Sequence, residues 1–140
     1  MIKIMPKFSK KSYEKYFEVL ANNVAKWTFL VGKPLNLYRT DKVLELLSIK
    51  ESTFMKFLRE GRKIGAVGVW GEDIYVINPF YATELEYIQS VYAAMWLDAT
   101  EHLRSESVNK TIDDKFMKFV DCDEMFNILK FNEFLKSLEK

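Results

Sequence analysis

Two short runs of strand-forming residues, in a chain that otherwise has helical periodicity, most constrain what this protein can fold into. The runs cover residues 66–70 and 74–77, and Gly71-Glu72-Asp73 between them is the kind of three-residue loop that closes a β-hairpin. Asn78-Pro79 ends the second run, because proline has no N–H with which to continue a β-ladder. The sequence therefore predicts an α+β, mostly α protein that contains a β-hairpin.

Helices are expected before the hairpin. The apolar residues that define the first are Tyr13, Tyr16, Phe17, Leu20, Val24 and Trp27. They recur every three or four positions, as on one face of a helix, and Gly32 interrupts the pattern. Residues 35–39 alternate between apolar and polar and favour a short strand. Thr40 is a suitable N-cap for a short helix over 41–48, and a longer helix should follow and end at Gly65.

More helices are expected after the hairpin. Thr83-Glu84-Leu85-Glu86 has the form of a capping box, in which the threonine and the second glutamate satisfy backbone N–H groups reciprocally. It predicts a helix of about five turns that runs to about Leu103. Residues 104–110 are polar and predict a loop, and two further helices are expected over 112–120 and 124–138.

Composition argues against enzyme and metal chemistry. Cys122 is the single cysteine, so no internal disulfide can form, and a reduced, cytoplasmic setting is expected. His102 is the single histidine and has no cluster of cysteines or histidines near it in the sequence, which favours an ordinary surface or interface histidine over a metal ligand. No apolar run approaches the length of a membrane span. We therefore expect a non-enzyme with no cofactor and no membrane contact.

Charge is unevenly distributed along the chain, although the whole chain carries only +1. Residues 1–65 contain 14 Lys/Arg and six Asp/Glu, whereas residues 66–140 contain seven Lys/Arg and 14 Asp/Glu. This split favours a basic binding surface in the first half and an acidic half that contacts a partner protein. The alternative is that these are ordinary solvated charges.

The order of a short helix, a tight turn, a longer helix and a hairpin resembles the winged helix-turn-helix. The resemblance is carried by KVLELLSIKESTFMKFLREGRKIGAV, and IYVINPFY is similar to the wing of RepL-type plasmid replication proteins and related phage proteins of Firmicutes. It implies a winged helix-turn-helix over residues 35–81. Residues 1–34 would supply a helix that packs on its core, and residues 82–140 a helical segment for dimerisation or partner binding.

By position, the resemblance implies that the longer helix inserts into the major groove of duplex DNA. The implied DNA-binding residues are Lys50, Glu51, Ser52, Thr53, Lys56, Arg59 and Lys63. The first four would face base edges, Lys56 lies one turn further on, and Arg59 and Lys63 would lie nearer the phosphates.

The sequence departs from the family pattern in the turn and in the wing. Lys50 stands where a capping serine is common, and Ser48 stands where the turn often has glycine. However, Ser48 and Glu51 together have the spacing of a capping box, which would start the helix two residues earlier. Glu72 and Asp73 at the wing tip are unsuited to gripping phosphates, so the wing is expected to face solvent or a partner subunit.

The resemblance implies sequence-specific binding of double-stranded DNA, in transcription regulation or replication initiation. The alternative is a winged-helix adaptor that binds proteins, with weak or no DNA affinity. One side of the helix expected from Thr83 carries large apolar residues, which either cover the chain's own core or pair across a homodimer. We favour the homodimer, and its interface residues would be Leu85, Ile88, Tyr92, Met95 and Trp96.

Overall fold

The computed structural model describes residues 5–28, 40–72, 74–81, 87–116 and 125–138, and within them the protein is α+β and mostly helical, as the sequence predicts. The first half comprises α1 (Lys11–Thr28), α2 (Thr40–Leu47), α3 (Glu51–Lys63), β1 (Val67–Trp70) and β2 (Ile74–Ile77). These are the helices and the hairpin expected from the sequence, while the strand expected over 35–39 lies outside the described residues.

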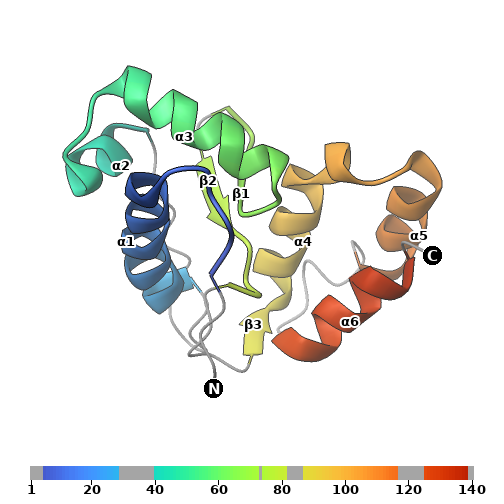
Figure 1. Cartoon of the computed structure of the whole chain (residues 1–140). Helices are drawn as coiled ribbons and strands as arrows, with labels where there is room; N and C mark the ends of the chain where they lie inside the picture. The colour runs from blue at the N-terminus through green and yellow to red at the C-terminus, as the bar shows by residue number, and fades with distance from the viewer. Residues whose placement is uncertain (1–4, 29–39, 73, 82–86, 117–124, 139–140) are drawn as a thin grey trace.

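The hairpin is sandwiched between helices. β1 and β2 pair antiparallel, with Val67 opposite Ile77 and Trp70 opposite Ile74. α1 packs against β2, whereas α3 and α4 (Ser90–Ala99) pack against β1 (Figure 1). The sheet has only two strands, and a lone hairpin is marginal in water, so this helical cover stabilises it.

An aromatic cluster joins α3 to α1 and to the hairpin. Phe57 of α3 is fully buried and meets the rings of Tyr13 and Tyr16 edge-on, with centroids 5.8 and 5.7 Å away. Phe54, one turn earlier, meets Tyr75 of β2 edge-on at 5.0 Å. Burying two large rings holds one side of α3 on the core and leaves its opposite side at the surface.

The turn between α2 and α3 has the backbone conformation that glycine adopts most easily. Ser48 has a φ of 54°, in the left-handed region, and is the only non-glycine residue with positive φ among those described. α3 begins at Glu51, and its N-cap Lys50 makes no side-chain capping hydrogen bond. The capping box expected from Ser48 and Glu51 is therefore wrong, because the left-handed turn at Ser48 separates it from the helix.

Asn78 ties the base of the hairpin to the end of α3. α3 ends before Gly65, which has a φ of 75°, and the Ala66 N–H donates to the Gly61 carbonyl at 2.8 Å. The Asn78 side chain donates to the Gly65 carbonyl at 2.9 Å and accepts from the Phe80 N–H at 3.0 Å. The Asn-Pro pair that ends β2 therefore also fixes the hairpin to the helix before it.

The second half differs from the sequence prediction. β3 (Tyr87–Gln89) pairs antiparallel with β4 (Met125–Asn127), and the remaining elements are η1 (Glu101–Leu103), α5 (Glu106–Phe116) and α6 (Ile128–Leu138). The five-turn helix expected from Thr83 is wrong over β3, and α4 begins only at Ser90. The loop expected over 104–110 is wrong because α5 begins within it, and the helix expected from residue 124 is wrong over β4.

α4 lies at the centre of the molecule and is buried on almost all sides (Figure 1). Gly68 of β1 lets it approach closely, because a Cβ there would lie 3.0 Å from the Ala99 Cβ. The Tyr92 hydroxyl donates to the carbonyl of Ile77 and accepts from its N–H, each at 2.7 Å. Burial raises the pKa of Tyr92 far above its ordinary value, so the hydroxyl stays protonated.

No helix in the described residues has both the length and the apolar character needed to cross a membrane.

Candidate nucleic-acid interface

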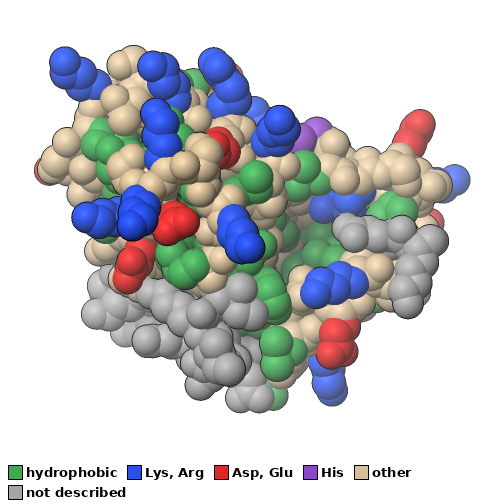
Figure 2. Space-filling model, in the orientation of Figure 1, with side chains coloured by type: hydrophobic (Ala, Val, Ile, Leu, Met, Phe, Trp, Pro, Cys, Tyr) green, Lys and Arg blue, Asp and Glu red, His purple; other side chains and the backbone are tan. Residues whose placement is uncertain are grey.

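One side of α3 forms a basic surface, on which four Lys/Arg side chains and one glutamate are exposed. Its core-facing residues are Phe54, Phe57, Leu58 and Gly61, which are all buried. The exposed residues are Glu51, Ser52, Met55, Lys56, Arg59, Arg62 and Lys63. Figure 2 shows Lys and Arg side chains gathered along the upper edge of the molecule, over α3. We call this surface, defined by those seven residues, the α3 face.

The amphipathic pattern of α3 explains why these side chains point outwards. Ser52, Lys56, Arg59 and Lys63 are spaced by three or four residues, and such residues lie one above the other along a helix. The buried positions are offset from them and follow their own helical period. The sequence therefore builds a helix with one aromatic side in the core and one basic side in solvent.

The structure brings most of the predicted DNA-binding residues onto this one surface. Lys50 is exposed at the N-cap, next to Glu51 and Ser52 in the first turn. Lys56, Arg59 and Lys63 follow along the α3 face. Thr53 differs from the others, because its side chain is only half-exposed at the edge of that surface.

Sequence reasoning missed Met55 and Arg62 on the α3 face. Met55 is 45% exposed although it is a large apolar residue. It follows Ser52 by three positions, and Arg62 follows Arg59 by three, so helical spacing would have placed both on the exposed side. Arg62 adds one more positive charge near the end of the helix.

Glu60 lies beside the basic residues but is held by the segment before α1. Its carboxylate accepts hydrogen bonds from the Ser9 hydroxyl and from the Ser9 N–H, the latter at 2.8 Å. These two bonds, together with the charges of Lys10 and Lys63, hold the pKa of Glu60 below its ordinary value. Glu60 is therefore a charged acceptor for Ser9.

The hairpin tip carries no positive charge among its described residues. Gly71 has a φ of 70° and Glu72 is exposed. Asp73, which the sequence also placed at the tip, lies outside the described residues. A tip of this kind repels phosphates, so favourable contacts of the hairpin with DNA would have to come from elsewhere.

Four of the five residues predicted to form a dimer interface are buried within the chain. Ile88, Tyr92, Met95 and Trp96 are all at most 5% exposed within a single chain, and Leu85 lies outside the described residues. At those four positions the exposed apolar stripe that motivated the dimer is absent. Tyr92, Met95 and Trp96 belong to α4, which packs against the hairpin, and Ile88 belongs to β3. Dimerisation itself stays a prediction.

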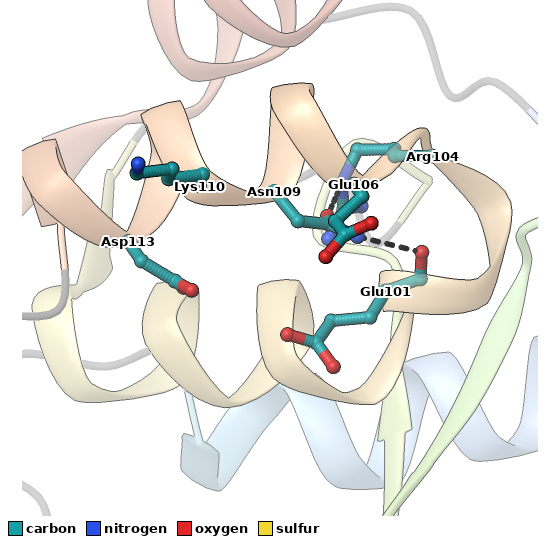
Figure 3. A pocket seen from close by; sticks show the side chains of 6 residues that line it. All are labelled: Glu101, Arg104, Glu106, Asn109, Lys110 and Asp113. Atoms are coloured by element: carbon teal, nitrogen blue, oxygen red, sulfur yellow. Dashed lines mark hydrogen bonds between the residues drawn. The ribbon is translucent and has the colours of Figure 1, made fainter.

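A shallow depression lies between η1 and α5 (Figure 3). It has a volume of about 450 Å³, and its lining residues are Glu101, Arg104, Glu106, Asn109, Lys110 and Asp113. Arg104 donates to Asn109 Oδ1 and Thr100 Oγ1, both at 2.9 Å, and to the Leu97 carbonyl. Its guanidinium thereby caps the C-terminal end of α4, a structural role.

His102 and the acidic residues do not form a metal centre in the part of the chain that the structure describes. No group of three His, Cys, Asp or Glu residues there is placed to hold a metal ion. His102 is exposed, and its Nε2 lies 3.4 Å from the Arg62 carbonyl at the end of α3. Cys122 lies outside the described residues.

Comparison with known proteins found no matching family model, no matching curated protein and no matching solved structure.

Proposed function

We propose that α2, α3 and the hairpin form a winged helix-turn-helix that binds double-stranded DNA with sequence specificity. The protein would act as a phage- or plasmid-type factor in transcription regulation or replication initiation. The observation that supports this proposal is the α3 face, a basic surface on a helix that follows a three-residue turn. A B-DNA major groove is about 12 Å wide and admits one such helix.

The residues along α3 suit different tasks. Ser52 lies in the first turn, and its hydroxyl can donate to or accept from base edges. Lys56 and Arg59 lie further along, where a long cationic side chain can reach a guanine edge or a flanking phosphate. Lys63 and Arg62 lie in the last turn and suit phosphates. In this proposal, specificity comes from the start of the helix and much of the affinity from its later residues.

The packing behind α3 supports this role. Phe54 and Phe57 are fully buried, so the helix is braced on its inner side. The Gly65–Asn78 hydrogen bond fixes its far end to the hairpin. A rigidly held helix loses less conformational entropy on binding than a mobile one, which favours affinity.

The test is Lys56→Ala combined with Arg59→Ala. Both side chains are exposed, so the free energy of unfolding should change by no more than about 0.5 kcal/mol per site. Affinity for duplex DNA should fall, and the slope of log affinity against log salt should become shallower by about 0.9 for each lost phosphate contact. Fluorescence anisotropy with a labelled duplex at several KCl concentrations measures both.

A matched control removes two exposed lysines from α6, by Lys130→Ala combined with Lys136→Ala. This pair also removes two positive charges, and it should leave the salt slope unchanged. If the α3 pair and the α6 pair weaken binding equally, α3 is not the DNA-binding element.

A second function, docking of a partner protein on the same helix, is favoured by one observation. Met55 exposes 45% of its surface within the α3 face, and methionine is enriched at protein interfaces. In this alternative the wild-type protein shows weak or no salt-dependent binding to duplex DNA. The anisotropy titration of the wild type therefore separates the two functions.

A further inference from the structure

We infer that the DNA-binding surface continues from α3 onto the segment that precedes α1, where exposed lysines form a second line of phosphate contacts. We call residues 5–10 the N-terminal arm. The lysines concerned are Lys7 and Lys10 of the arm, with Lys11 at the start of α1. The inference rests on the proposed DNA binding. It adds to it a second set of phosphate contacts, made by a region far from α3 in the sequence.

Aromatic packing holds the arm against α3. The Phe8 ring stacks on Phe57 with centroids 5.3 Å apart, and Phe8 also meets Tyr13 edge-on at 6.3 Å. Phe8 also lies next to Gly61 of α3, since a Cβ at Gly61 would be at an ordinary van der Waals distance of 3.6 Å from Phe8 Cε1. The arm therefore belongs to the core at Phe8, and its neighbouring residues have a fixed place beside the helix.

Hydrogen bonds fix the arm at a second point. Ser9 donates from both its hydroxyl and its N–H to the Glu60 carboxylate. Glu60 lies four residues after Lys56 and three before Lys63, so the three share one stripe of α3. The arm thus borders the α3 face along its Lys56–Lys63 edge.

The lysines of the arm add charge to that edge. Lys7, Lys10 and Lys11 are all exposed. The Lys10 ammonium lies over the Tyr13 ring, 5.3 Å from its centroid, which restricts where it can move. The charges of Lys10 of the arm and Lys63 of α3 both lower the pKa of Glu60, so the two lysines lie near the same carboxylate. In Figure 2, Lys and Arg side chains also gather below α3, over the start of α1.

The geometry of the duplex explains what this edge would meet. An α-helix with its side chains is about 10–12 Å across, so it fills a major groove that is about 12 Å wide. A sugar-phosphate strand then passes along each side of the inserted helix. Lysines that border one long edge of α3 therefore lie where one of these strands runs.

The experiment compares salt slopes for two pairs of substitutions, using a labelled duplex of random sequence. Lys7→Gln with Lys10→Gln should make the slope shallower by about 1.8, which corresponds to two lost phosphate contacts. Lys130→Gln with Lys136→Gln is a matched control, since Lys136 also lies over an aromatic ring, that of Phe80 at 5.6 Å. The control should keep the wild-type slope.

A second pair keeps the charge in place. Lys7→Arg with Lys10→Arg should retain the wild-type slope, and circular dichroism checks that each variant is folded. An unchanged slope for the glutamine pair in a protein that still binds DNA overturns this inference alone, as does an equal loss in the α6 control. Absence of salt-dependent binding by the wild type overturns the proposed function as well.

Discussion

α3 and α4 both pack against β1, yet they differ in how much of their surface is exposed. α3 has 13 residues and buries only the side that carries its aromatic rings. α4 has 10 residues, of which Asp98 alone is exposed and Val91 is partly buried. Every other side chain of α4 is occupied by contacts within the chain, whereas seven residues of α3 face solvent.

The difference separates the part of the molecule that holds the hairpin from the part that can meet a partner. Substitutions in α4 should act on the free energy of unfolding, because they change buried contacts. Exposed substitutions in α3 should act on binding and leave folding nearly unchanged. A reversed outcome at Tyr92 of α4, or at Lys56 and Arg59 of α3, would weaken this division.

The largest effect is expected at Tyr92 of α4. Tyr92→Phe keeps the ring but removes the hydroxyl that satisfies both the N–H and the carbonyl of Ile77. Two buried polar groups are then left unpaired, and the free energy of unfolding should fall by roughly 2–5 kcal/mol. Urea denaturation followed by circular dichroism measures the loss.

The control for this prediction is Tyr87→Phe in β3. Tyr87 is 47% exposed, so loss of its hydroxyl should change stability by less than about 0.5 kcal/mol. If both variants lost the same free energy of unfolding, burial of the hydroxyl would not explain the effect at Tyr92.

A smaller effect of opposite sign is expected at Ser48, in the turn before α3. Ser48 has a φ of 54°, which glycine adopts without steric cost. Ser48→Gly should therefore stabilise the protein by up to about 1 kcal/mol. By contrast, Ser52→Gly, within α3, should destabilise it by about 0.5 kcal/mol, since glycine is a poor helix former. Thermal unfolding of the two variants should show melting temperatures that move in opposite directions.

The smallest effect concerns pH. It compares the hydrogen bonds between Ser9 and Glu60 with those between Tyr92 and Ile77. Hydrogen bonds from Ser9 lower the pKa of Glu60 in the folded state, so its contribution to stability is present above the ordinary glutamate pKa. That contribution is lost as pH falls through the lowered value. Glu60→Gln should therefore reduce the melting temperature slightly at pH 7 and make no difference in strong acid.

The hydrogen bonds between Tyr92 and Ile77 give a reference for this pH series. Burial raises the pKa of Tyr92, so its hydroxyl is protonated throughout the same range, and the effect of Tyr92→Phe should not change with pH. Differential scanning fluorimetry from pH 7 to pH 2 compares the two. A Glu60→Gln effect that persisted in acid would show that the carboxylate charge is not what holds Ser9.

Local signals in the sequence predicted much of the first half of the fold. Gly65 marks the end of α3 because glycine adopts positive φ easily, and Asn78-Pro79 marks the end of β2 because proline cannot donate a ladder hydrogen bond. The exposed side of α3 also followed from helical spacing. The left-handed backbone at Ser48 was indicated only by the resemblance, in which the turn often has glycine at this position, and the same serine also fitted a capping box.

Long-range contacts explain what the sequence could not reveal. Ile88 of β3 pairs with Phe126 of β4, and nothing near either residue signals its partner. The apolar residues of α4 fitted a dimer interface as well as an internal core, because periodicity does not specify what covers a helix. The contact between the arm and α3 was also missed, because Ser9 and Glu60, which it joins, are 51 positions apart in the sequence.

The bond between Asn78 and Gly65 also restricts how this sequence can vary in length. The two residues are 13 positions apart, and the whole hairpin lies between them. Adding one residue to a single strand would exchange the two faces of that strand and move Asn78 out of register. Insertions should therefore be tolerated as matched pairs at the exposed tip. A glycine followed by Asn-Pro at this spacing, or at this spacing plus an even number, is then a pattern with which distant relatives can be sought.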